Sequence, residues 1–360
     1  MLSTSYLFLG GAGAGMLVAL CVLECLNARR RFGHRGDRTR LGRTFAGRAI
    51  GPLRTEPMRG SDGLRYFEGG YSQKEAEAAC GRWSRGAVPR TFALPAEVFA
   101  RSWPVCLVVL ALGILCLIAD LGRPDRLLVL ALSPKLSAMT VGALALGFSF
   151  LVALVFFICA NFDGFDLSAT FVYTLSVVGI VVGLVCLLYT GVLLSGLASV
   201  LFWQTWLLPL VFALSSFSCG IALVFLAAAF VDVRQVMVRP LTELACVDGM
   251  LLTLEFVALI AYIAWGLLQE GTFEAAYSIV AGDLSAAFWG GVIVAGLVLP
   301  FAMERFIGHS SYRTQIVWIA VAILFGGLVL RFCIVEAGAY DMTQMTGALY
   351  KLSVNAGWYS

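Results

Sequence analysis

The chain has 360 residues, of which 60% are hydrophobic and 13% are charged, and its formal net charge is +3. Soluble domains carry about 25% charged residues, so this composition excludes a soluble fold and indicates a polytopic membrane protein. The chain contains only two His, and none of its ten Cys forms a CxxC pair. We therefore expect no metal site and no iron–sulfur cluster within this chain.

Long apolar stretches recur along the whole sequence. A bilayer core of about 30 Å needs about 20 apolar residues in a helix. Eight stretches meet this requirement, and their continuous apolar character excludes a membrane β-barrel. We expect transmembrane helices at residues 6–27, 103–119, 137–160, 169–195, 207–231, 250–269, 286–303 and 314–335.

Basic residues are concentrated between the first two predicted helices. The segment 29–101 holds 16 of the 25 Lys and Arg residues against 7 acidic residues, whereas the rest of the chain is net acidic. Basic loops stay in the cytoplasm, so this distribution predicts that both termini are extracytoplasmic. The predicted organisation is a first transmembrane helix at 1–28, an Arg-rich cytoplasmic loop at 29–101, helices two to four at 102–200, a second four-helix bundle at 201–336 and an extracytoplasmic tail at 337–360.

The starts of the first and fifth helices share a pattern of small residues. Gly10, Gly11, Gly13, Ala14 and Gly15 align at one constant offset with Ser215, Ser216, Ser218, Cys219 and Gly220. Small residues let membrane helices approach closely, so Gly10, Gly11, Gly13, Gly15 and Gly220 are predicted helix-packing positions. The repeat predicts an all-α integral membrane fold of about eight helices in two four-helix bundles.

A polar run, Asp120-Leu-Gly-Arg-Pro-Asp-Arg126, closes the second predicted helix. Ionised side chains are costly in lipid, so Asp120 and Arg123 need a partner or a function. One interpretation is a functional site. The alternative is a helix-terminal ion pair that fixes the loop, with Pro124 ending the helix.

Two further acids fall within predicted helices. Glu255 lies well inside the sixth helix, where an ionisable group is a candidate for proton transfer. A neutral hydrogen-bonded carboxyl and a direct ligand contact are the alternatives for Glu255. Glu24, near the cytoplasmic end of the first helix, could join a proton pathway or face lipid headgroups beside Arg29.

Four segments together resemble the NrfD family of membrane subunits of polysulfide-reductase-type complexes. They are residues 6–15, 120–124, 189–195 and 326–338, and the stretch 208–223 also resembles that family's fifth helix. The resemblance implies an anchor that binds menaquinone or ubiquinone. It also implies a ferredoxin-like iron–sulfur partner subunit and, through it, a molybdopterin catalytic subunit, with no haem in the anchor itself.

The residues support a haem-free quinone site near the outer face. His34 and His309 both lie in predicted cytoplasmic loops, so no His pair faces across a bundle. Tyr189 could donate a hydrogen bond to a quinone carbonyl, Asp120 could exchange protons, and Arg123 could keep Asp120 charged. Tyr6 is a further candidate for the quinone site, with an interfacial aromatic as its alternative. Glu336 completes the predicted proton pathway with Glu255 and Glu24.

The predicted function is therefore electron transfer between membrane quinone and an iron–sulfur subunit of a molybdopterin-dependent respiratory oxidoreductase, coupled to proton translocation. We expect a multi-pass protein of the bacterial cytoplasmic membrane that contacts the lipid bilayer and no nucleic acid. The principal alternative is a secondary transporter with a substrate site between the two bundles. A purely structural anchor is a third interpretation.

Overall fold

The computed structural model describes residues 2–33, 96–121, 138–161, 169–197, 200–230, 234–269, 271–305 and 312–355, and these form helices and short connections. In chain order the elements are α1 (Leu2–Gly33), α3 (Ala96–Leu121), α5 (Ala138–Asn161), α6 (Ala169–Ser195), the 3₁₀ turn η2 (Leu201–Trp203), α7 (Leu207–Ala229), α8 (Arg234–Leu268), α9 (Phe273–Val280), the π-helix η3 (Ala287–Val298), α10 (Leu299–Arg305) and α11 (Tyr312–Asn355). Eight helical segments are long and apolar enough to cross a membrane, with η3 and α10 together forming the seventh. The prediction of an all-α membrane fold with eight spans is confirmed.

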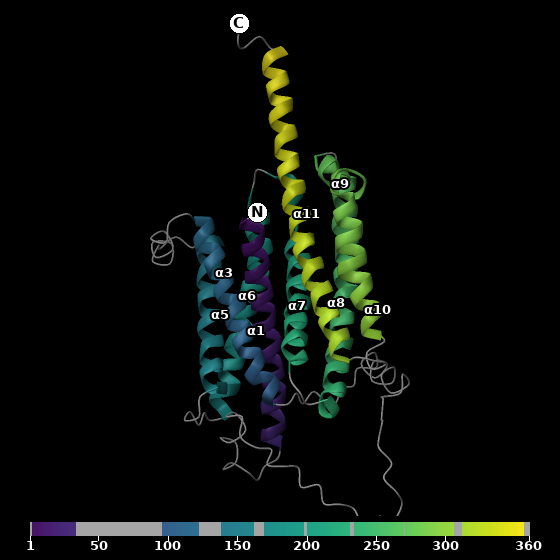
Figure 1. Cartoon of the computed structure of the whole chain (residues 1–360). Coiled ribbons are helices and arrows are strands. Elements are labelled where there is room, and N and C mark those ends of the chain that lie inside the picture. The colour runs from purple at the N-terminus through teal and green to yellow at the C-terminus, as the bar shows by residue number, and fades with distance from the viewer. Residues whose placement is uncertain are drawn as a thin grey trace, which may run out of the picture.

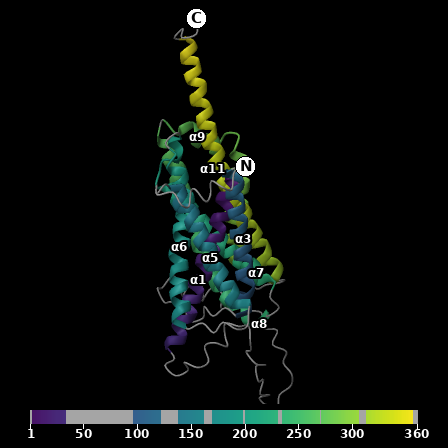
Figure 2. The same cartoon turned by 90° about the vertical axis from the view of Figure 1, so that its left-hand side faces the viewer.

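The helices contact one another in two rings (Figures 1 and 2). The first ring consists of α1, α3, α5 and α6, each of which packs against two neighbours in the ring. The second ring consists of α7, α8, the η3–α10 segment and α11, and α9 covers one of its ends. The rings meet mainly where α7 packs against α1 and α6. Accordingly, α1 and α7 are the most buried spans, and the other spans expose more of their apolar side chains to lipid.

The two rings are joined where α1 crosses α7. A Cβ atom at Gly15 would overlap the backbone of Ser216, and one at Gly220 would overlap the backbone of Gly15. Gly11 lies against the Ser216 hydroxyl. Gly11 and Gly15 thus contact the residues with which they align in the sequence, and the two helices run in parallel. Only small residues permit this backbone approach in lipid.

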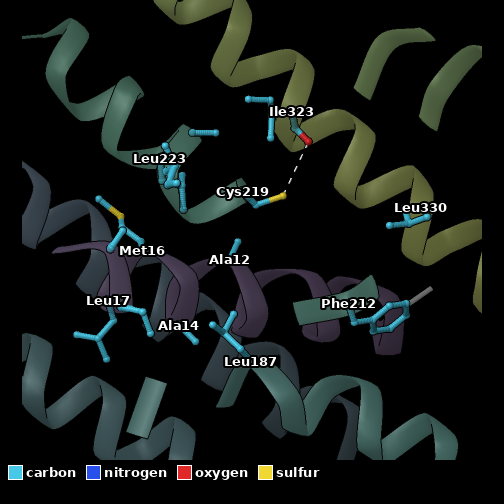
Figure 3. Close-up of a cluster of buried hydrophobic side chains, with 14 of the residues drawn as sticks. Ala12, Ala14, Met16, Leu17, Leu187, Phe212, Cys219, Leu223, Ile323 and Leu330 are labelled. Carbon is cyan, nitrogen blue, oxygen red and sulfur yellow. Dashed lines mark hydrogen bonds between the residues drawn. The ribbon is translucent and has the colours of Figure 1, made fainter. Parts of the chain in front are cut away.

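Apolar side chains fill the space around this crossing (Figure 3). Met16 of α1 lies near Leu223 of α7, and Ala14 of α1 lies near Leu187 of α6. Each of these side chains belongs to a single continuous buried cluster. The core therefore connects the two rings and is not divided between them.

Both chain ends lie at the same end of the helical body, which we call the terminal end (Figure 1). The last span was predicted to end near residue 335, with a tail at 337–360. In the structure α11 continues as one helix from Tyr312 to Asn355, beyond the other spans. Most of the predicted loop at 29–101 lies outside the described residues.

Three elements differ from the prediction. The sixth span begins at Leu241 instead of residue 250, so Glu243 and Asp248 lie within it. Single acidic residues look like the end of an apolar run in sequence, but both of these side chains are buried between helices. The short helix α9 and the π-helix η3 were not predicted, because an apolar run does not distinguish α from π hydrogen bonding.

Candidate functional site

Two buried tyrosines meet near the terminal end of the first ring. The Tyr6 hydroxyl of α1 donates a hydrogen bond to the Tyr189 hydroxyl of α6 over 2.9 Å. Their side chains are only 3% and 5% exposed. Tyr6 is therefore enclosed by protein and does not face the headgroups, as its interfacial alternative would require. The Tyr189 ring also packs directly against Gly142 of α5, where the missing side chain makes room for it.

Asp120 lies close to this tyrosine pair. It is the penultimate residue of α3, and its side chain is exposed. Asp120 is near enough to Tyr6 to interact with it electrostatically. Arg123 lies outside the described residues, so its predicted contact with Asp120 remains a prediction. The structure thus brings together Tyr6, Tyr189 and Asp120 from three helices of one ring.

This arrangement can donate hydrogen bonds and move protons. A phenol hydroxyl that accepts one hydrogen bond still carries its own hydrogen. The Tyr6–Tyr189 pair can therefore present one O–H to a third oxygen while the two hydroxyls stay bonded to each other. The exposed Asp120 carboxylate beside the pair can accept a proton from water or from a neighbouring hydroxyl. Such a group of residues suits a ligand whose carbonyl oxygens are protonated when it is reduced.

The three acids of the predicted proton pathway lie in different surroundings. Glu255 of α8 is buried in the second ring, and Glu24 is buried near the other end of α1. Burial of Glu24 is at odds with its alternative, which was contact with headgroups. Glu336 of α11 is exposed. The described residues do not bring these three acids into one cluster.

Arg331 of α11 is the centre of a polar cluster at the junction of the rings. It is fully buried, and its guanidinium donates hydrogen bonds to the Gly327 carbonyl at 2.8 Å and to the hydroxyls of Ser215 and Ser216. The charge also lies over the rings of Phe8 and Phe212, at 5.6 and 5.4 Å from their centroids. Such contacts stabilise a cation that has left water.

Glu255 provides the opposite charge in this cluster. Its carboxylate interacts with the Ser215 hydroxyl and with the Arg331 guanidinium. A buried cation beside a buried acid is retained only where hydrogen bonds satisfy it, and the hydroxyls of Ser215 and Ser216 contribute to that for Arg331. A direct quinone contact was one alternative for Glu255, but its described partners are protein groups.

A small cavity adjoins Glu255 between α7, α8, η3 and α11. It is lined by polar Ser215, Cys219 and Glu255 and by apolar residues that include Gly296 and Gly327. About 10 Å³ of it is open to the centre of a water molecule, which is close to the space that one water needs. The cavity is too small for an organic ligand.

A second buried acid lies further along α8. Asp248 is fully buried next to Ser218 of α7 and Glu304 of α10. Both of its carboxylate oxygens lack a hydrogen-bond partner among the described residues. The sequence analysis missed Asp248 because it placed this residue outside the membrane.

The η2 turn is fixed against the second ring near the terminal end. The Trp203 indole donates a hydrogen bond to the Ile334 carbonyl at 3.0 Å, and the Tyr262 hydroxyl donates one to the Phe202 carbonyl at 3.0 Å. Trp203 is thereby buried against α11, whose Gly338 makes room for the indole. These two hydrogen bonds attach the η2 turn to α8 and α11.

Sequence reasoning also did not assign a role to Arg331, Ser215 or Ser216. A signal for Arg331 was present, because an Arg inside a long apolar run is rare and usually has a buried partner. The partners themselves come from α7 and lie more than 100 positions away, so only the fold identifies them.

Comparisons with known proteins agree with the motifs. A family model described as "Polysulphide reductase, NrfD" matches residues 93–342. The C subunit of polysulfide reductase from Wolinella succinogenes is 29% identical over 244 residues, which cover 63% of this chain and 77% of that protein. Protein NrfD of Escherichia coli is 32% identical over 155 residues, which cover 42% of this chain and 48% of that protein.

Proposed function

Because the chain belongs to the NrfD family, we propose that it is the quinone-binding membrane subunit of a respiratory oxidoreductase. In this role it transfers electrons between membrane menaquinone or ubiquinone and an iron–sulfur partner subunit. That ferredoxin-like partner connects it to a molybdopterin catalytic subunit. The family match and the polysulfide reductase relative suggest a membrane subunit of such a complex, while the quinone itself is our inference.

The observation that carries the proposal is the buried hydroxyl pair of Tyr6 and Tyr189 beside Asp120. A quinone carbonyl needs a hydrogen-bond donor, and the pair has a hydrogen to give. Reduction to the quinol also takes up two protons, for which Asp120 is a route from the aqueous side because its side chain is exposed. The donors come from α1 and α6, which pack against each other and hold the pair in place.

The orientation of the subunit is part of the proposal. The basic segment 29–101 follows the first span and indicates that the end of the helical body opposite the terminal end faces the cytoplasm. The terminal end and the tyrosine pair then face outward. The iron–sulfur partner then docks at the outer face of a bacterial cytoplasmic membrane. The two helical rings support the two-bundle division, with the quinone assigned to the first bundle.

Proton translocation coupled to turnover is the second part of the proposal. The buried charges of Glu255, in the second ring, and Arg331, at the junction of the rings, support it. The transporter alternative receives no support from this arrangement. It requires a substrate site between the bundles, whereas α1 and α7 meet there through their backbones.

The test is binding of a quinone analogue to the purified complex, followed by fluorescence quenching. We expect Tyr189→Phe and Asp120→Asn each to weaken binding, because one removes the donor and the other the neighbouring proton acceptor. Glu274→Gln, an exposed acid of α9 at the same end, is the matched control and should bind as wild type does. Absence of saturable binding by the intact wild-type complex would contradict the proposed quinone site.

A further inference from the structure

Several polar atoms of the second ring are buried without a hydrogen-bond partner among the described residues. They are both carboxylate oxygens of Asp248, Oγ of Ser218 and Nε of Arg331. The three side chains are at most 1% exposed. Buried polar groups of native proteins are nearly always satisfied, either by protein or by ordered water. These atoms therefore have bonding capacity left for the polar side chains beside them, as Asp248 has Ser218 and Glu304, or for ordered water.

The side chains that carry these atoms lie one after another along α7 and α8 of the second ring, and we call this series the proton line. Asp248 lies beside Ser218, and Glu255 lies beside Ser215 and Arg331. On α8, Asp248 and Glu255 are separated by seven residues, or about 10 Å along the helix axis. On α7, Ser218 and Ser215 are one turn apart and share a helix face.

The cavity described above lies on this line. It touches Ser215 and Glu255 directly, and Leu252, which lies between the two acids on α8, forms part of its wall. One water fits in it, with the Ser215 hydroxyl and the Glu255 carboxylate as polar partners. Its wall also includes Gly296 of η3, and π-helical segments recur at functional sites in proteins.

The charges around the two acids differ. The charged groups that face Asp248 are Glu304 of α10 and, further along its own helix, Glu255. Glu255 instead faces the Arg331 guanidinium of α11. Asp248 and Glu304 are two carboxyl groups side by side away from water, and such a pair can hold one proton between them. The two acids thus end one series of polar side chains, with Arg331 beside Glu255.

We propose that Asp248 is a proton-binding carboxyl, connected to Glu255 and Arg331 through Ser218 and Ser215 of α7 and a water in the cavity that Ser215 and Glu255 line. A proton that leaves Asp248 binds to the neighbouring oxygen of the line. That oxygen then releases its other proton to the oxygen that follows it. Each intervening hydroxyl and water ends with the hydrogens with which it began. Because Arg331 also lies over Phe8 of α1, the line ends at the helix that carries Tyr6. This proton line deepens the proposed function, and the role of the line in turnover rests on that function.

Carbodiimide labelling of the intact complex tests the proton-binding site without any substitution. N,N′-dicyclohexylcarbodiimide adds to carboxyl groups that are protonated in apolar surroundings, and peptide mass spectrometry locates the adduct. We expect an adduct at Asp248 and none at the exposed Glu274. In Asp248→Asn the adduct should disappear, while Glu274→Gln should leave the labelling of Asp248 as it is. An unlabelled Asp248 in the folded complex would overturn the proposal.

Charge movement in proteoliposomes that contain the whole complex tests the role in turnover. We expect the membrane potential generated per electron to be lost in Asp248→Asn and reduced in Ser218→Ala, with Glu274→Gln equal to wild type. Wild-type charge movement in Asp248→Asn would overturn the proton line. Failure of the proposed function would look different, because the wild-type complex would then show no quinone-dependent electron transfer at all, and the labelling result would decide on Asp248 independently.

Discussion

The tyrosine pair shows how two side chains that are 183 positions apart form one donor. Each was identified from sequence, Tyr6 in the glycine-rich first helix and Tyr189 at the end of the fourth. Their hydrogen bond was not predictable, because it depends on how α1 packs on α6. The space for the Tyr189 ring depends in turn on Gly142 of α5, which no motif indicated.

Gly142 therefore allows a test that leaves both hydroxyls in the protein. In Gly142→Ala, the new methyl group would overlap the Tyr189 ring and displace its hydroxyl from Tyr6. We expect the affinity for a quinone analogue to fall about fivefold, as for the loss of one neutral hydrogen bond. Gly147→Ala on the same helix is the control, since a Cβ there meets no atom within 4 Å. Equal affinities in the two variants would show that the pair does not bind the ligand.

Substitution of Arg331 should lower the stability of the protein strongly. In Arg331→Met, Glu255 would keep a buried charge without its counter-ion, and we expect a loss of about 3–5 kcal/mol in the free energy of unfolding. Thermal unfolding in detergent measures this.

The double variant Arg331→Met with Glu255→Gln should regain part of the lost stability, because no uncompensated charge remains. If the double variant is as unstable as the sum of the two single variants, the two side chains are not coupled.

At the scale of elements, apolar length predicted all eight spans but not their details. The start of α8 was placed too late, because its buried Asp248 has the appearance of a boundary in the sequence. The π-helix η3 has the same apolar composition as an α-helix of that length, so the sequence did not distinguish its hydrogen bonding from that of an α-helix. Glycine contacts such as that between Gly296 and Gly326 become visible only in the structure.

The crossing of α1 and α7 makes a prediction at this scale. Gly220→Ala would drive a methyl group into the backbone of α1, so we expect a loss of about 1–3 kcal/mol in stability or a failure to assemble. Gly10→Ala is the matched control, because the nearest atoms to a Cβ there are side-chain carbons at 3.8 and 3.9 Å. Detergent thermal stability of the two variants should differ clearly. Comparable stabilities would mean that the helices can separate at this point.

For the whole molecule, the sequence repeat indicated two halves and the charge distribution indicated an orientation. The structure adds that both chain ends lie at one end of the helical body (Figure 1). It also shows that the candidate residues divide between the rings, with the hydroxyl pair in the first and the buried charges in the second. The predicted bundle bounds had already put Tyr189 in the first bundle and Glu255 in the second, and the structure adds the contacts that each side chain makes.

Because both termini lie at the terminal end, the predicted orientation can be tested with reporter fusions. Alkaline phosphatase fused after Ser360 should be active, and green fluorescent protein at the same point should be dark, because both termini are predicted to be extracytoplasmic. A fluorescent protein inserted in the segment 29–101 should be bright. The reverse pattern would place the tyrosine pair and its docking partner on the cytoplasmic side.

The close approach of Gly15 to Gly220 also limits how the two halves can influence each other. Backbone contact at this point leaves no room for one helix to move toward the other, so rocking of one half against the other would have to separate Gly15 from Gly220. An electric field can pass between the halves without such a separation. In a dry interior such a field is weakly screened, and a change of charge near Tyr6 acts on Arg331 and Glu255 without any movement of helices.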